Sequence, residues 1–151
     1  MDKLKPFLYK HGYRLLRIYW FFRRPTTQGV RCVVVHGDTV LLVKHTYGSA
    51  YWTTVGGGIQ SGESLEQAVV REVHEEVGLV LDNAFKIGEV FHEQEYKKDT
   101  VHVFLGFTSQ PDVRLDKAEI ASAKWVSIKN LPNDVSPLFR KFFNLAQPHL
   151  K

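Results

Sequence analysis

The sequence predicts an α+β fold in which helices cover a mixed β-sheet. Segments rich in β-branched and aliphatic residues alternate with segments whose apolar residues recur at helical spacing, and this interleaving is typical of such a fold. The 151 residues, 44% of them hydrophobic and 24% charged, fit a globular domain with a sizeable core. Disordered, collagen-like and multidomain chains are therefore excluded.

A basic arm over residues 1–28 precedes the predicted domain of residues 29–151. Residues 1–24 carry seven basic side chains and one acidic one, a balance of +6, whereas the rest of the chain has a balance of −2. The apolar residues of the arm fall on one face of a helix that Pro25 ends. We expect this amphipathic helix to pack on its own domain or to form a homodimer with a second copy. The alternatives are an anionic membrane surface and the phosphates of RNA.

Two features predict a cytoplasmic protein. The longest uncharged apolar stretch of the arm, Ile18 to Phe22, has five residues, whereas a secretory signal needs about 7 and a membrane span about 18. We therefore expect no transmembrane segment. The single cysteine, Cys32, lies in an apolar run, which excludes an intrachain disulfide and a cysteine metal site.

The predicted domain opens with a β-hairpin. Residues 30–35 and 40–43 are mostly aliphatic, and His36-Gly37-Asp38 between them supplies turn residues. A short strand beginning near Tyr47 then runs into three consecutive glycines at 56–58, where the backbone must bend or admit a ligand closely.

A helix over Ser64 to Val77 is the most strongly marked element. Ser64 and Gln67 have the spacing of a capping box, and Gly78 stands where a left-handed C-cap is expected. An apolar stripe follows one face of this helix, formed by Leu65, Val69, Val73 and Val77.

Three strands and a helix complete the expected fold. Residues 85–91 and 101–108 have strand patterns and are separated by a charged turn over 93–99. Residues 124–128 form another short strand, and a last helix covers about 138–146 after the prolines of a loop.

Three glutamates on the first helix of the domain carry the chemistry. Glu72, Glu75 and Glu76 are spaced i, i+3, i+4, so their side chains lie on one side of one helical turn. Three carboxylates so close repel one another, and Arg71 can pair with Glu75 but neutralises only one charge. A hard divalent cation with oxygen ligands is the natural counter-ion, and the adjoining glycine turn offers free backbone groups to a phosphate.

The stretch from Gly57 to Leu79 resembles the Nudix box, GX5EX7REUXEEXGU with U aliphatic, at every defined position: Gly57, then Glu63, then REVHEEVGL from Arg71. This resemblance implies a Nudix-like α/β/α sandwich. It also implies that Glu72, Glu75, Glu76 and the carbonyl of Gly56 bind metal, that Arg71 orients the glutamates, and that Glu63 supports the loop and helix. By the same resemblance Gly57 and Gly78 are structural, and the general base is either Glu72 or Glu119. Glu93 and Glu95 are weaker candidates.

The resemblance further implies a Nudix hydrolase that breaks a phosphoric anhydride bond with the help of Mg²⁺ or Mn²⁺. Its expected substrate is a nucleoside diphosphate linked to a group X: a (d)NTP, a nucleotide sugar, a dinucleoside polyphosphate or a 5′-triphosphate RNA end. The alternative is a non-catalytic Nudix-fold module that senses a nucleotide. Intact Glu72, Glu75 and Glu76 favour the enzyme, because a sensor has no need of three repelling carboxylates.

Two aromatic residues are candidates for substrate binding. Trp52, just before the glycines, can stack on a base, and Tyr96 lies at a spacing linked to dinucleoside polyphosphate hydrolases. One departure from the family pattern lies upstream: Thr54-Val55 stands where many members have Leu-Pro, and Gln60 replaces an acidic residue.

Overall fold

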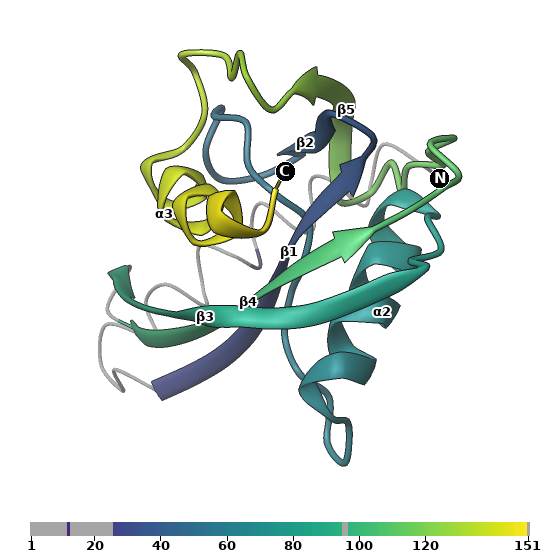
Figure 1. The fold of residues 1–151 in the computed structure, drawn as a ribbon. Helices are drawn as coiled ribbons and strands as arrows, with labels where there is room; N and C mark the ends of the chain where they lie inside the picture. The colour runs from purple at the N-terminus through teal and green to yellow at the C-terminus, as the bar shows by residue number, and fades with distance from the viewer. Residues whose placement is uncertain (1–11, 13–25, 95–96, 151) are drawn as a thin grey trace.

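A computed structural model describes residues 12, 26–94 and 97–150. It shows a five-stranded mixed sheet between two helices, so the expected α/β/α sandwich of the α+β class is confirmed (Figure 1). The predicted arm helix and Tyr96 lie outside the described residues.

Eight elements follow one another along the described chain. The strands β1 and β2 come first, then the helix α2, the strands β3 to β5, the helix α3 and a short 3-10 turn, η1. Their bounds are β1 Thr26–His36, β2 Thr39–His45, α2 Leu65–Val77, β3 Asn83–Gln94, β4 Lys97–Phe107, β5 Ile120–Ser127, α3 Pro137–Ala146 and η1 Gln147–His149.

The sheet has the order β3-β4-β1-β2-β5. The central pair β1 and β4 is parallel, and the other pairs are antiparallel. The expected hairpin of β1 and β2 is present, but its strands pair only beside the turn, at Val35 with Val40 and at His36 with Thr39. Residues 53–58 enter the gap that opens between them, with bridges to β1 and to β2. The three glycines are thereby set into the middle of the sheet.

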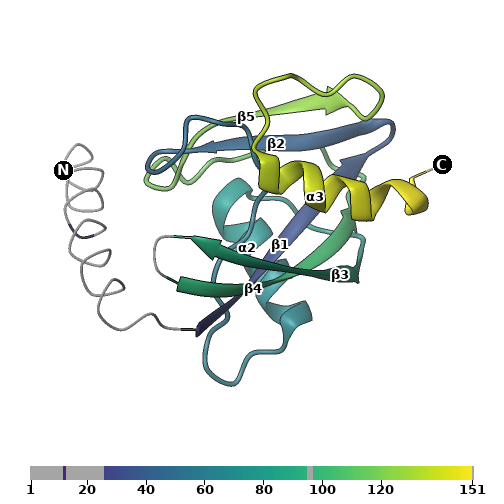
Figure 2. The ribbon, with the colours of Figure 1, turned by 90° about the vertical axis from the view of Figure 1, so that its left-hand side faces the viewer.

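Each face of the sheet buries its own apolar cluster. The helix α2 lies on one face of the sheet and α3 on the other (Figure 2). The apolar stripe of α2 packs with the β1 side chains of Val30, Cys32 and Val34, and α3 packs with Val33 and Val35. The alternation of β1 residues between the two clusters follows from the two-residue period of a strand. Cys32 is fully buried, as expected.

Three parts of the chain differ from the sequence prediction. The strands β3 and β4 run through much of the expected charged turn over 93–99, where Glu93 faces Lys98 across the hairpin. Opposite charges on facing strands stabilise such pairing, so a charged segment need not be a turn. The strand β5 begins at Ile120, four residues earlier than expected. The residues before the glycines form isolated bridges instead of a continuous strand.

The helices of the described residues are short: α2 has 13 residues and α3 has 10. None of the helices in this part of the chain has the length and apolar character needed to cross a bilayer.

Candidate active site

The start of α2 is fixed by local hydrogen bonds. The Ser64 hydroxyl accepts from the Gln67 backbone N–H at 3.1 Å, and the Gln67 side chain accepts from the Ser64 N–H at 2.9 Å. This is the predicted capping box, and at the other end Gly78 adopts the predicted left-handed conformation with φ 69°. A Cβ on Gly78 would lie 2.9 Å from the Arg114 Cβ, so the C-cap glycine also lets the loop after β4 pass close by.

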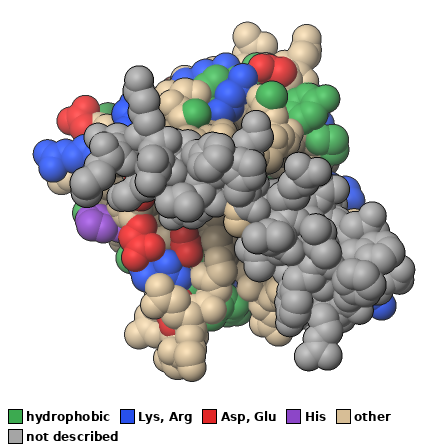
Figure 3. Space-filling model, turned by 180° about the vertical axis from the view of Figure 1, so that it is seen from behind, with side chains coloured by type: hydrophobic (Ala, Val, Ile, Leu, Met, Phe, Trp, Pro, Cys, Tyr) green, Lys and Arg blue, Asp and Glu red, His purple; other side chains and the backbone are tan. Residues whose placement is uncertain are grey.

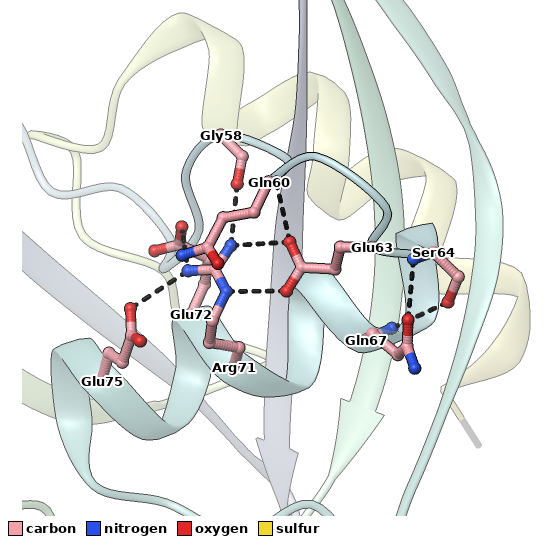
Figure 4. A network of polar contacts seen from close by, with 8 residues as sticks. All are labelled: Gly58, Gln60, Glu63, Ser64, Gln67, Arg71, Glu72 and Glu75. Carbon is pink, nitrogen blue, oxygen red and sulfur yellow. Dashed lines mark hydrogen bonds and ion pairs between the residues drawn. The ribbon is translucent and has the colours of Figure 1, made fainter.

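Arg71 connects the helix to the loop before it (Figure 4). Its Nε and Nη2 donate to the two carboxylate oxygens of Glu63 at 2.7 and 3.0 Å, and Nη2 also donates to the Gly58 carbonyl at 3.0 Å. Its Nη1 donates to Glu72 at 2.8 Å and to Glu75 at 3.0 Å. The hydrogen bond to Glu63 is the first cause that raises the pKa of Arg71 and lowers the pKa of Glu63. One guanidinium thus contacts three of the four glutamates of the predicted box.

Gly57 makes room for Glu72. A Cβ on Gly57 would lie 2.7 Å from Oε1 and 2.8 Å from Oε2 of Glu72, which is closer than carbon and oxygen can approach without a bond. The Glu72 carboxylate is therefore held between the glycine backbone on one side and Arg71 on the other. Only 12% of its side chain is exposed, whereas 56% of the Glu75 side chain is.

Glu76 points inward and is almost fully buried, with 3% exposed. Its Oε2 accepts the Gly56 N–H at 2.9 Å. Burial raises the pKa of Glu76 to about 7, Arg31 and the Gly56 N–H oppose this shift, and the charges of Glu72 and Glu119 add to it. The Gly56 carbonyl accepts from the Arg31 guanidinium at 2.7 Å. Glu76 and Arg31 therefore contact the same residue, Glu76 at the N–H of Gly56 and Arg31 at its carbonyl.

Glu119 lies in the turn just before β5 and is brought to the same place. Burial raises its pKa, and the charges of Asp116, Glu72 and Glu75 raise it further. Among the described residues its carboxylate has no hydrogen bond or ion pair. The fold thus places the half-buried, unpaired carboxylate of Glu119, which is distant from α2 in sequence, beside the glutamates of that helix.

Trp52 is placed elsewhere. It packs with the apolar cluster on the α3 side of the sheet, whereas the glutamates belong to α2. The ammonium groups of Lys44 and Lys124 lie 4.7 and 4.1 Å from the centre of its ring. The structure therefore does not bring Trp52 into contact with the glutamates.

Two residues of this region were missed by the sequence analysis. Arg31 is the one charged residue in the aliphatic run over 30–35. A charged residue within a run of this kind was the sequence feature that could have indicated it. His45, at the end of β2, is mostly buried, and both of its ring nitrogens lack a hydrogen-bond partner among the described residues. Burial and the charge of Arg31 lower its pKa to about 4. Nothing in the sequence around His45 marked it.

The departure from the Leu-Pro pattern also has a structural role. Thr54 is fully buried, and its hydroxyl donates to the Cys32 carbonyl, which ties the segment before the glycines to β1. The Gln60 backbone N–H donates to Glu63 at 2.9 Å, a contact that does not depend on the side chain at position 60.

The geometry agrees with comparison to known proteins. The NUDIX domain family matches residues 25–145, most of the chain. This chain belongs to the Nudix family. As a member it is a hydrolase that acts on pyrophosphate bonds, and hydrolases of this family generally use a divalent metal.

Two curated relatives and one solved structure illustrate the Nudix match. A protein of Bacillus subtilis (strain 168) named "Putative 8-oxo-dGTP diphosphatase" is 32% identical over 118 residues, 78% of this chain and 78% of that protein. The NAD-capped RNA hydrolase NudC of Klebsiella pneumoniae (strain 342) is 31% identical over 105 residues, 67% of this chain but 40% of NudC. The crystal structure of the MutT protein of Methanosarcina mazei Go1 is 28% identical with a TM-score of 0.73, covering 85% of this chain and 98% of that one.

The donors of the Nudix site suit a hard divalent cation by their chemistry. They are carboxylate and carbonyl oxygens, and a Cβ at Gly57 would fill the space that Glu72 uses. In the described part of the chain no three acidic, histidine or cysteine side chains converge on one point. Arg71 contacts Glu72 and Glu75, and the Gly56 N–H donates to Glu76. Figure 3 shows the face of the molecule opposite to that seen in Figure 1, where acidic and basic side chains lie next to one another. A metal at Glu72 or Glu75 would therefore compete with their contacts to Arg71.

Proposed function

We propose that this Nudix hydrolase is a Mg²⁺-dependent pyrophosphohydrolase that cleaves a nucleoside diphosphate linked to a group X. The observation that supports the proposal is the position of Glu72 and Glu76 against the glycine loop: Glu76 accepts the Gly56 N–H at 2.9 Å, and a Cβ on Gly57 would lie 2.7 Å from Glu72 Oε1. Carboxylates crowded in this way favour a divalent cation, and Mg²⁺ binds through few carboxylates, water and substrate phosphates. Mn²⁺ has similar ligand preferences.

Glu72, Glu75, Glu76 and the Gly56 carbonyl are the proposed metal ligands. When bound, the metal would supply positive charge that polarises the phosphate and stabilises the leaving group. Arg71 would orient Glu72 and Glu75, because its guanidinium already contacts both. Glu63 would fix Arg71 in turn through its two-pronged contact.

Glu119 is the proposed general base, in preference to Glu72. A general base needs a carboxylate free to take a proton and a pKa raised toward neutrality. Glu119 has both properties, whereas Glu72 already accepts a hydrogen bond from Arg71. In the proposed step a water oxygen forms a bond to phosphorus, the anhydride P–O bond breaks, and Glu119 takes the proton of the water. The products are a nucleoside monophosphate and phosphorylated X, or pyrophosphate.

A (d)NTP is the substrate class we favour, because the relative matched over 78% of both chains is named for a deoxynucleoside triphosphate. Nucleotide sugars and dinucleoside polyphosphates also contain a diphosphate linked to a nucleoside, so they are included among the substrates to be tested. The role of Trp52 and Tyr96 in holding a base is also a proposal. A cytoplasmic location agrees with the lone buried Cys32.

An RNA 5′ end is the second candidate substrate. It is favoured by the arm of residues 1–24, with its balance of +6, and by the similarity to NudC, of which this chain spans 40%. Replacing the seven basic residues of the arm with Gln should weaken RNA binding between 50 and 200 mM salt if they contact phosphates. If wild type and this variant bind RNA equally across that range, the arm does not support RNA as a substrate. Gel filtration of the wild-type chain tests the predicted homodimer.

The decisive experiment measures release of phosphate, pyrophosphate or monophosphate from a panel of (d)NTPs, nucleotide sugars, dinucleoside polyphosphates and triphosphate-ended RNA, with and without Mg²⁺ or Mn²⁺. We expect metal-dependent cleavage of one class. Binding of a nucleotide without cleavage of any would overturn the proposal in favour of the sensing module.

A further inference from the structure

Arg31 is a half-buried cation on β1 whose role the proposed mechanism leaves open. Its Nη1 donates to the carbonyls of Gly56 at 2.7 Å and Thr54 at 3.3 Å. Among the described residues it forms no ion pair with a carboxylate. A guanidinium has five N–H donors in a planar fork, so most of its donors have no protein acceptor in the described structure.

The Gly56 carbonyl has little freedom to move away from Arg31. Gly56 has φ 136°, and a Cβ at this position would lie 2.1 Å from the Val30 carbonyl oxygen. The peptide is therefore packed directly against β1. Any cation that uses this carbonyl must come to it where it stands, beside Arg31.

The charge of Arg31 also acts on Glu76. It opposes the effect of burial on the Glu76 carboxylate, which is the role of a counter-ion. The neighbouring His45 does not share this role, because burial and Arg31 lower its pKa to about 4 and leave it neutral near pH 7. Arg31 thus supplies positive charge to the two groups, Gly56 and Glu76, that are proposed to hold the metal.

Arg31 is not needed to attach the glycine segment to β1. The Cys32 N–H donates to the Val55 carbonyl at 3.0 Å, and the Val30 N–H donates to the Gly57 carbonyl at 2.9 Å. The Thr54 hydroxyl adds a further bond to β1. A merely structural role would therefore duplicate bonds that the backbone already makes.

We propose, on the basis of the proposed function, that Arg31 takes the place of the divalent cation at Gly56 and Glu76 in the metal-free protein and turns to the substrate diphosphate when metal binds. A guanidinium and a divalent cation on one carbonyl oxygen repel strongly, so one must leave. The planar fork of an arginine matches phosphate oxygens. Arg31 is thus a competitor of the metal and a ligand of the diphosphate.

Mn²⁺ binding to the full chain, followed by electron paramagnetic resonance without substrate, tests the competition. Arg31→Gln removes a positive charge from the site and should bind Mn²⁺ about tenfold more tightly than wild type. Arg31→Lys keeps the charge and should stay near wild type. Arg140→Gln is the matched control, because Arg140 is an exposed arginine on α3, which packs on the other face of the sheet from α2, and it should change Mn²⁺ affinity less than about twofold.

Binding of imidodiphosphate at saturating Mn²⁺ tests the second part of the proposal, the contact of Arg31 with the diphosphate. Its dissociation constant should rise at least about tenfold in Arg31→Gln, and less in Arg31→Lys, because an ammonium group lacks the two-pronged contact. Arg140→Gln should bind it as wild type does. Equal affinity of Arg31→Gln and wild type would overturn the contact with diphosphate.

The outcomes separate this inference from the proposed function. Equal or weaker Mn²⁺ binding by Arg31→Gln, with or without a lower thermal midpoint, would make Arg31 a structural residue and overturn the inference alone. A wild-type protein that binds no Mn²⁺ and cleaves no nucleotide would overturn the proposed function, and the inference with it.

Discussion

The carboxylate of Glu72 lies against Gly57, in the space that any side chain at position 57 would fill. A Cβ there would lie 2.7 Å from Glu72 Oε1. The glycine that begins the Nudix box is therefore a steric requirement of Glu72, separate from any need for unusual backbone angles, since Gly57 is not among the glycines with positive φ.

Gly57→Ala should displace Glu72 and lower kcat by about 10- to 100-fold, since small displacements of reacting groups have effects of that size. Steady-state kinetics with the cleaved substrate would measure this. Gly58→Ala is the matched control, because a Cβ on Gly58 meets nothing within 4 Å, and it should keep near wild-type activity. Equal activity of both variants would contradict the steric requirement.

Glu75→Gln or Glu76→Gln should lower turnover by at least about 100-fold while the fold stays intact, because each removes a proposed metal ligand. Circular dichroism checks the fold, and product release checks turnover. Glu66→Gln, an exposed change in the first turn of the same helix, should have little effect. Activity near wild type in both site variants would refute the assignment of the metal site.

The metal-free protein should lose stability as pH rises from about 4.5 to 7. The folded-state pKa of Glu76 is about 7 and its ordinary value is 4.5, so the protonated form favours the folded state. This contribution is complete below pH 4.5 and is lost as pH rises through 7, at a cost of about 3 kcal/mol in the free energy of unfolding.

Urea unfolding of wild type and Glu76→Gln at pH 5 and pH 8, with EDTA, would measure this loss. Gln stays uncharged at both pH values, so the variant should be the more stable protein at pH 8 and close to wild type at pH 5. If the free energy of unfolding of the two proteins changes with pH in the same way, ionisation of Glu76 does not destabilise the folded state.

Glu119→Gln should lower kcat by at least about 100-fold. Because the pKa of Glu119 is raised above its ordinary value of 4.5, the acidic limb of the wild-type pH profile of kcat/KM should lie above that pH, with activity gained as the carboxylate loses its proton. The limb should disappear in the variant.

Glu66→Gln is also the control for Glu119→Gln, because Glu66 is exposed in the first turn of α2 and has no proposed role in the site. It should leave both rate and profile unchanged. A pH profile that keeps its acidic limb in Glu119→Gln would return the role of general base to Glu72.

The sequence by itself determined the elements whose signals are local. The capping box and Gly78 mark the ends of α2 within a few residues of the helix, and the aliphatic runs over 30–35 and 40–43 mark β1 and β2. The spacing of Glu72, Glu75 and Glu76 fixed their common side of the helix in the same way. Such features depend on neighbours along one turn or one strand, so they can be read before the chain is folded.

Only the tertiary structure decided which distant groups meet. Arg31 and Gly56 are 25 residues apart, Gly56 and Glu76 are 20 apart, and Glu119 joins them from the turn before β5. Their contacts depend on β1 and β2 separating after two residue pairs and admitting the glycine segment between them. That arrangement is set by the packing of both faces of the sheet, for which no local pattern in the chain provides a signal.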